Sequence, residues 1–204
     1  MLTVLLAFMS TQNVFAATLD QKQETVHNNA TAQILSNDPL GQEFRPTLGT
    51  LEAVEVWIGT MNPGGDDTIT LTIRQGSVTG AVLATADKSL TQGFSGWVYF
   101  TLGLVRVTAG SIYVIRLSAT KNTFGWFYSD LNPYPGGMAI MGELGIPEML
   151  PADDFTFRTY GSISSTVGGV VLPTSKLDIV APFAALGGLV VAVSAVVAVK
   201  RRRA

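Results

Sequence analysis

The sequence predicts an all-β protein: an antiparallel β-sandwich of jelly-roll type, with one transmembrane helix at the C-terminal end. Three observations support this fold class. Apolar and polar residues alternate with period two through the middle of the chain, turn-forming residues separate the alternating runs, and long chargeless apolar stretches occur only near the two ends. Period-two alternation places successive side chains on opposite faces of a strand, so the middle is expected to be pleated sheet.

Residues 1–17 predict a secretory signal peptide. The apolar run Leu2–Met9 has eight residues, and at ~1.5 Å rise per residue it is too short to cross a ~30 Å hydrocarbon layer. The small residues Ala16 and Ala17 follow a short polar stretch, and signal peptidases cut after such residues. No Lys or Arg precedes the apolar run, which is atypical of a signal peptide. A buried N-terminal strand is the alternative.

Residues 18–161 predict the β-sandwich ectodomain, built from eight or so short strands. The clearest strand is Thr68–Arg74, where every second residue is apolar. Further alternating runs are Leu51–Ile58, Gly96–Leu102, Ser111–Ser118, Thr123–Ser129, Met138–Met141 and Asp154–Tyr160. Gly, Pro and Asn cluster between these runs, above all at 62–67 and 132–137. This spacing is typical of a sandwich, with a closed barrel as the alternative.

The order of these features resembles a group of exported β-sandwich modules known as choice-of-anchor domains, found on bacterial and archaeal surface proteins. The matching stretches lie within residues 32–161: Gln42–Thr47, Leu51–Ile58, Asp67–Arg74, Gly80–Ala84, Gly96–Phe100, Val107–Tyr113 and Asp154–Gly161. The resemblance implies a surface location and a role in adhesion or glycan binding. It supplies no functional residues, because its motifs are combinations of turns and strands.

The C-terminal part predicts a membrane anchor. Residues 162–178 are rich in Ser, Thr and Gly, as expected of a flexible stalk. Ile179–Val199 then provides 21 chargeless residues, enough to span a bilayer as a helix, and a basic tail at 200–204 follows. Basic residues beside a span stay in the cytoplasm, so we expect a single-pass cell-membrane protein with its N-terminus outside. A buried core helix is the alternative.

The predicted span also permits a dimer. Ala184, Gly188 and Ala192 are spaced by four, and small residues at this spacing allow two membrane helices to approach closely.

Composition excludes several kinds of site. The chain has no cysteine, so disulfides and zinc–thiolate centres are excluded. Residues 18–178 hold nine Lys and Arg against fifteen Asp and Glu, a balance of −6, and we expect no nucleic-acid partner. Because His27 is the only histidine, an enzyme is not expected. An anchored glycoside hydrolase using two carboxylates is the least favoured alternative.

The aromatic stretch Phe124–Tyr134 carries the candidate ligand-binding site. Aromatic rings beside Asp and Asn are suited to sugars, because the ring covers the C–H face while the polar groups bind hydroxyls. The predicted ligand-binding residues are Trp126, Tyr128, Asp130, Asn132 and Tyr134, with Tyr134 expected to be exposed. Aromatic residues that simply fill the core are the alternative.

No cofactor is expected except a structural calcium ion. Its candidate oxygen ligands are the acidic pairs Asp66 with Asp67 and Asp153 with Asp154. Solvated turn residues are the alternative explanation for both pairs. Asn29-Ala30-Thr31 matches the acceptor pattern for N-glycosylation.

These features together predict a membrane-anchored surface protein that recognises a glycan or another surface protein. A structural component of the cell envelope, assembled into a layer or filament without a small ligand, is the alternative function.

Overall fold

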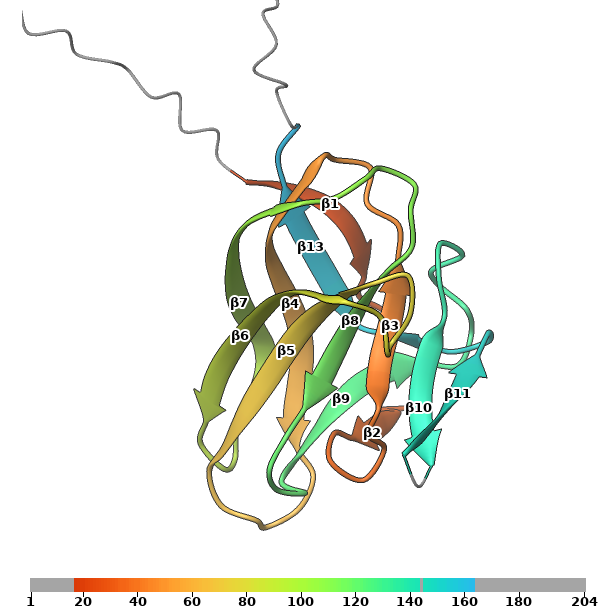
Figure 1. The fold of residues 1–204 in the computed structure, drawn as a ribbon. Coiled ribbons are helices and arrows are strands. Elements are labelled where there is room, and N and C mark those ends of the chain that lie inside the picture. Colours follow the sequence, from red (N-terminus) through yellow and green to blue (C-terminus); the bar gives the residue numbers. More distant parts are fainter. Residues whose placement is uncertain (1–16, 144, 164–204) are drawn as a thin grey trace, which may run out of the picture. The chain divides into compact units, whose positions relative to one another are not determined.

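The computed structural model describes residues 17–143 and 145–163, and within them all regular structure is β (Figure 1). Two antiparallel sheets are present, one of seven strands and one of six. None of these residues forms a helix of the length and hydropathy that crossing a bilayer requires. The predicted stalk beyond residue 163, the transmembrane helix and the basic tail lie outside the described residues, as does nearly all of the signal peptide, and they stay predictions.

The seven-stranded sheet, here sheet A, runs in the order β1-β13-β4-β9-β12, with β2 also paired to β9 and β7 to β4. Its strands are β1 (Thr18–Gln23), β2 (Thr31–Gln33), β4 (Thr50–Thr60), β7 (Ser95–Arg106), β9 (Phe124–Ser129), β12 (Asp154–Phe155) and β13 (Phe157–Gly161). Strand β4 organises the sheet. One of its edges pairs with β7, while the other pairs first with β13 and then with β9.

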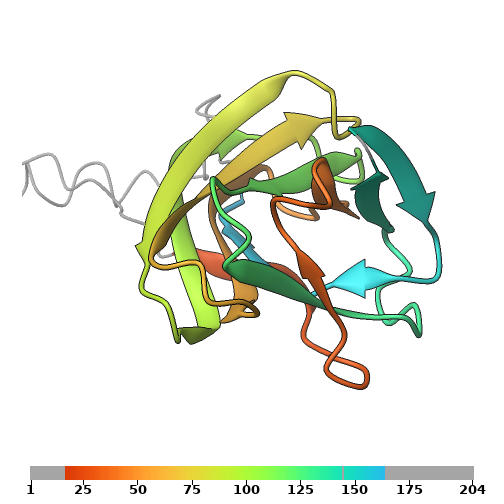
Figure 2. The same ribbon diagram turned by 90° about the horizontal axis from the view of Figure 1, so that it is seen from below.

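The six-stranded sheet, here sheet B, runs in the order β11-β10-β3-β8-β5-β6. Its strands are β3 (Leu40–Phe44), β5 (Asp67–Gln75), β6 (Val82–Leu90), β8 (Tyr113–Ser118), β10 (Ala139–Glu143) and β11 (Ile146–Leu150). Figure 2, seen from below, shows the two sheets facing one another. The prediction of an antiparallel two-sheet fold is therefore confirmed for the described residues.

The core lies between the sheets and follows the alternation of the sequence. In sheet B the buried apolar side chains of β5 are Ile69, Leu71 and Ile73, the set that the pattern predicts. Sheet A contributes Val54, Val56 and Ile58 from β4, and Val98 and Phe100 from β7. Because the side-chain period of a strand is two, the residues between these point away from the core, and they form the outer face of sheet A.

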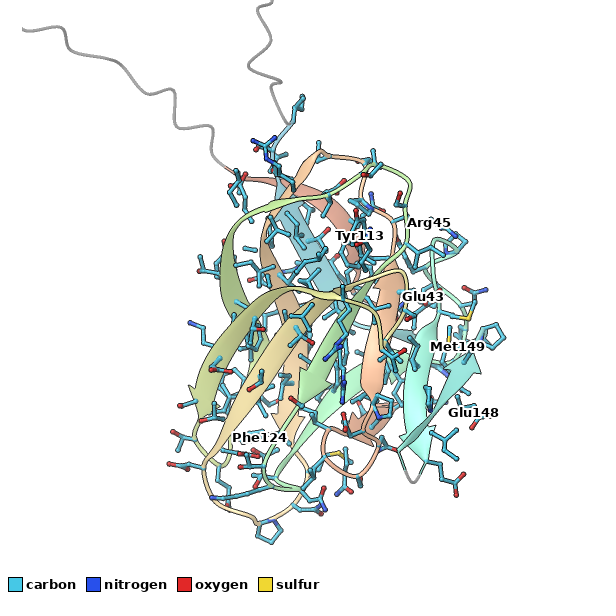
Figure 3. The ribbon with its side chains drawn as sticks, in the orientation of Figure 1. Glu43, Arg45, Tyr113, Phe124, Glu148 and Met149 are labelled. Atoms are coloured by element: carbon cyan, nitrogen blue, oxygen red, sulfur yellow. The ribbon has the colours of Figure 1, made fainter. Side chains whose placement is uncertain are left out.

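Some strands differ from the predicted set. Strands β1, β6 and β11 have no clear alternation, and most of their side chains are exposed. Glu148 and Met149 of β11 lie at the outer margin of sheet B (Figure 3). The predicted strand Asp154–Tyr160 is divided at Thr156 into β12 and β13. There the Thr156 backbone N–H bonds the carbonyl of Phe127.

The two ends of the described sandwich meet. Thr18 at the start of β1 pairs with Gly161 at the end of β13, and both strand ends lie at the top of Figure 1. Further hydrogen bonds tie Thr50 of β4 to Ser162, including one from the Thr50 N–H to the Ser162 carbonyl at 3.2 Å. The described part of the chain therefore begins and finishes at the same end of the sandwich.

Candidate functional site

The predicted aromatic site on β9 divides between the core and the surface. Trp126 is fully buried, with 0% of its surface exposed. Its indole stacks on Phe155 at 4.4 Å, and its N–H bonds the Thr156 carbonyl at 2.7 Å. Tyr134 is only 8% exposed and packs edge-on against Phe157 at 5.0 Å. The expectation that Tyr134 is exposed is therefore wrong, and neither ring offers a face to a ligand in solvent.

Three of the five predicted ligand-binding residues remain accessible or partly so. Asp130 and Asn132 are exposed, and Tyr128 is half-buried against Phe155. The Asp130 carboxylate contacts Nδ1 of His27 at 2.5 Å. Burial raises the pKa of the Tyr128 hydroxyl, and the nearby Asp153 and Asp130 charges raise it further. These residues form a polar rim beside β9, and their ligand-binding role stays a prediction.

The acidic pair Asp153 and Asp154 also separates. Asp154 is fully buried, and its two carboxylate oxygens accept hydrogen bonds from Gln42 Nε2 at 3.0 Å and from the Tyr134 backbone N–H at 2.9 Å. Burial raises the pKa of Asp154, although these two hydrogen bonds act in the opposite direction. Burial and the neighbouring Asp130 raise the pKa of Asp153. Asp154 thus joins the loop before β10 to strand β3.

The second pair, Asp66 and Asp67, borders a shallow hollow of about 260 Å³ that Thr120 and Lys121 also line. The Asp67 carboxylate accepts hydrogen bonds from the Thr120 hydroxyl at 2.6 Å and from the backbone N–H groups of Lys121 and Thr68, both at 2.8 Å. Burial alone raises the pKa of Asp67, but these hydrogen bonds outweigh it and leave the pKa below its ordinary value.

These donors bear on the calcium prediction. The N–H and O–H groups around Asp67 occupy its oxygens, and the Lys121 ammonium lies 2.6 Å from the Asp66 carbonyl. A calcium site needs several oxygens free to face one ion, so this arrangement does not fit one. Across residues 17–143 and 145–163, no three His, Cys, Asp or Glu side chains gather in a way that could hold a metal ion.

The largest group of accessible rings lies elsewhere, on the outer face of sheet A. We define the outer aromatic patch as Trp57 of β4, Trp97 and Tyr99 of β7, Phe127 of β9 and Tyr160 of β13. Tyr99 is 43% exposed, and the other four are half-buried. All five come from the positions that alternate with core residues, so the strands themselves hold the rings on one surface.

The rings of the patch contact one another across the strands. Trp57 and Trp97 are a direct cross-strand pair with centroids 5.6 Å apart and planes inclined by 56°. On the other side of β4, Phe127 meets Trp57 edge-on at 6.1 Å. A Cβ placed on Gly59 would lie 2.7 Å from the Phe127 ring, so the glycine makes room for this ring. Tyr99 and Tyr160 form a second pair at 5.9 Å.

Charged side chains of opposite sign lie beside the rings on the outer face of sheet A and pair with one another. The Arg158 guanidinium lies 4.0 Å from the Trp97 ring centroid and bonds Glu24 at 2.6 Å and Glu55 at 3.1 Å. Lys22 also pairs with Glu24, and hydrogen bonds from Lys22 and then Arg158 lower the pKa of Glu24. The four named charges cancel, two of each sign, so the patch presents rings and paired polar groups without an excess of either charge.

Two further hydrogen-bonding groups belong to the patch. The Tyr160 hydroxyl donates to Glu55 at 2.6 Å, and burial followed by this contact raises the pKa of Tyr160. The indole N–H of Trp57 is buried and has no hydrogen-bond partner among the described residues. A donor left without a partner in a folded protein is uncommon and costs free energy.

The sequence contains the signal for this patch. Alternation in Gly96–Leu102 sets Trp97 and Tyr99 opposite the core residues Val98 and Phe100, and alternation in β9 sets Phe127 opposite Trp126. The dense run of aromatic residues in the sequence of β9 instead indicates Trp126 as the ligand-binding residue. What the sequence does not show is that β4, β7, β9 and β13 are neighbours, and this pairing brings the outer rings together.

Comparison with known proteins places the chain in no established group: no family model matches it, and no curated protein is significantly similar to it.

Proposed function

We propose that this chain is an exported, membrane-anchored surface protein whose β-sandwich binds a neutral glycan through the outer aromatic patch. The observation that carries the proposal is the row of three rings, Phe127, Trp57 and Trp97, on the outer face of sheet A. Aromatic faces cover the C–H surfaces of sugars, while neighbouring polar groups bind the hydroxyls. Arg158, Glu55 and the Tyr160 hydroxyl provide such groups beside the rings.

The charge pattern favours an uncharged ligand. An acidic polysaccharide would meet Glu24 and Glu55, and a basic one would meet Arg158 and Lys22, so either would have to break an existing ion pair. Each of these partly exposed pairs is individually weak, but a neutral sugar chain leaves them intact and can hydrogen-bond to the paired groups as they stand.

The location of the protein rests on segments outside the described residues. The apolar run at 2–9, the small residues at 16 and 17 and the chargeless stretch 179–199 support export followed by anchoring. The two antiparallel sheets support a sandwich, and the sequence resemblance within residues 32–161 is what supports a jelly-roll module of the choice-of-anchor type. In this proposal the sandwich stands outside the cell and the basic tail inside.

A glycan array probed with the purified full chain tests the binding role. We expect retention on neutral glycans, and we expect Trp97→Ala to lower the affinity at least about tenfold, which corresponds to a loss of about 1.4 kcal/mol. Leu104→Ala is the matched control, because Leu104 is an exposed apolar residue of the same strand, β7. Thermal unfolding of both variants separates lost binding from lost folding.

Two results would reject the proposed ligand site. The first is binding to acidic glycans alone. The second is neutral-glycan binding that survives both Trp97→Ala and Trp57→Ala without change. If Asp130→Ala then abolished that binding, the ligand would sit on the polar rim with Asp130 and Asn132.

A further inference from the structure

The turn between β1 and β2 presents two asparagines at its tip. Asn28 and Asn29 are exposed and have positive φ values of 50° and 56°. The turn is closed by the Ala30 N–H, which bonds the His27 carbonyl at 2.9 Å. Two successive left-handed residues define a tight type I′ turn, and asparagine tolerates that conformation better than other residues with side chains. The sequence therefore forms an exposed turn here and places carboxamides at its tip.

Only one of the seven asparagines of the chain lies in an acceptor motif for N-glycosylation. Asn29 is followed by Ala30 and Thr31, whereas Asn62 and Asn132 are each followed by proline, and the remaining asparagines have no Ser or Thr two residues on. The motif requires a carboxamide and a hydroxyl two residues apart, without an intervening proline. Here the Thr31 hydroxyl donates to the backbone carbonyl of Asn29 at 3.0 Å, so the turn directs the hydroxyl of the motif back toward the residue that carries the carboxamide.

The edge position of the turn leaves space for a bulky group. Strand β2 has three residues, and within the described part of the chain it pairs only with β9. The backbone of the turn is held on its inner side, where the Tyr128 N–H bonds the Ala30 carbonyl at 3.0 Å. A substituent on the Asn29 side chain would extend away from this attachment without disturbing a core residue.

We propose that Asn29 Nδ2 is an N-glycosylation site, a modification that rests on the proposed export of the chain. The donor class is a lipid-linked oligosaccharide phosphate or pyrophosphate. A C–N bond forms between Nδ2 and the anomeric carbon of the first sugar as the C–O bond to the lipid phosphate breaks. The carboxamide gives up one proton, and the lipid phosphate leaves with the bonding electrons. No oxidant or reductant is required.

The modified turn would stand beside the outer aromatic patch. Thr31 of β2 is the cross-strand partner of Phe127 of β9, which belongs to the outer aromatic patch. A glycan attached to Asn29 would therefore start two residues before the partner of a patch ring. It would cover the free edge of β2, where unpaired backbone groups invite association with another strand. The glycan would thus shield one margin of the patch from other proteins.

Peptide mapping by mass spectrometry tests the site on the full chain isolated from cells that produce it naturally. We expect the peptide containing Asn29 to carry a hexose-containing mass increase that peptide N-glycosidase or chemical deglycosylation removes. The increase should disappear in Asn29→Gln and Thr31→Ala and persist in Thr31→Ser, which keeps the hydroxyl. Asn28→Gln is the matched control, because Asn28 shares the turn and the positive φ but lies outside the motif, and it should keep the increase.

The same sample separates failure of this inference from failure of the proposed function. Protease added to intact cells reports whether the sandwich is outside. An accessible sandwich with an unmodified Asn29 peptide would overturn the glycosylation site and leave surface exposure intact. An inaccessible, unmodified chain would overturn both. A mass increase that survives Thr31→Ala would also overturn the assignment, because the motif would then not direct it.

Discussion

At the residue scale, Asp154 is a fully buried carboxylate held by hydrogen bonds on both oxygens. Its buried carboxylate accepts from Gln42 Nε2 and from the Tyr134 N–H, while its own carbonyl accepts from Gln23 Nε2 at 2.9 Å. The orientation of the Gln42 amide is fixed, because its Oε1 accepts from the Phe155 N–H at 2.7 Å. Both carboxylate oxygens therefore face donors that cannot reverse their roles.

We expect Asp154→Asn to destabilise the protein by about 1–3 kcal/mol, because the new NH₂ group must face one of these two donors and leaves it without a partner. Since burial raises the folded-state pKa of Asp154, the native protein takes up a proton more readily than the unfolded chain. The wild type therefore gains stability from this group as the pH falls through that raised pKa, and the gain is lost as the pH rises again.

The Asn variant lacks this titration, so the difference in stability between the two proteins should widen toward low pH. Urea unfolding of the full chain, followed by tryptophan fluorescence over a pH series, measures it. If the difference in the free energy of unfolding stays constant or narrows as the pH falls, Asp154 does not carry the proposed pH dependence of stability.

The burial of individual residues decides which part of the site can be predicted from the sequence. The period-two pattern correctly separates Trp126 from Phe127 on opposite faces of β9. It cannot say which face is covered, because that depends on sheet B packing over one side. The aromatic residues near Trp126 in the sequence predict a ligand-binding role for it. Its contacts in the fold, with Phe155 and Thr156, instead place Trp126 in the core.

At the scale of elements, β11 shows how the free margin of sheet B is protected. Its side chains are largely exposed, with Ile146 71% and Met149 44% accessible. A free strand with apolar side chains invites pairing with a second molecule, and proteins counter this with proline or charge. Pro147 and Glu148 supply both in the middle of β11.

Replacing Pro147 with Val and Glu148 with Thr should therefore promote association through β11. We expect the weight-average mass of the full chain to rise with concentration in the double variant and not in the wild type, as measured by sedimentation equilibrium in matched detergent. Adding Ile146→Lys to the variant should reverse the effect, because it restores a charge on the strand. An unchanged mass in the double variant would show that this edge is blocked by other means.

Strands can be predicted from the sequence where only one face of the strand is buried. Strand β5 and residues 54–58 of β4 cover one face with core residues, so their alternation can be recognised in the sequence. Strand β6 has exposed residues on both faces, and β11 is exposed except at Leu150, so neither leaves a periodic signal. The division of Asp154–Tyr160 at Thr156 depends on a contact with β9 that no local pattern reveals.

At the scale of the whole molecule, strands distant in sequence are adjacent in sheet A. The last strand, β13, lies between the first strand β1 and the central strand β4. It also places Phe157 in the core and Arg158 and Tyr160 on the outer face. Removing β13 therefore takes away a core residue, two polar patch residues and the partner of β1 at once.

A chain that ends at Thr156 should fail to fold, whereas one that ends at Ile163 should give a compact, protease-resistant sandwich. Limited proteolysis and near-ultraviolet circular dichroism of the two truncated chains distinguish these states. Equal resistance of both chains would contradict the central role of β13. Loss of structure in both would show that the sandwich needs residues beyond 163.

The interior place of β13 has a consequence for a chain that crosses a membrane with its N-terminus leading. Strand β1 is the first to emerge, yet its partner is among the last segments to follow. Until residue 161 has passed through the translocation channel, sheet A lacks an inner member and cannot close. On the proposed export route, sheet A is therefore completed only after residue 161 has crossed the membrane, and the polypeptide stays unfolded until then.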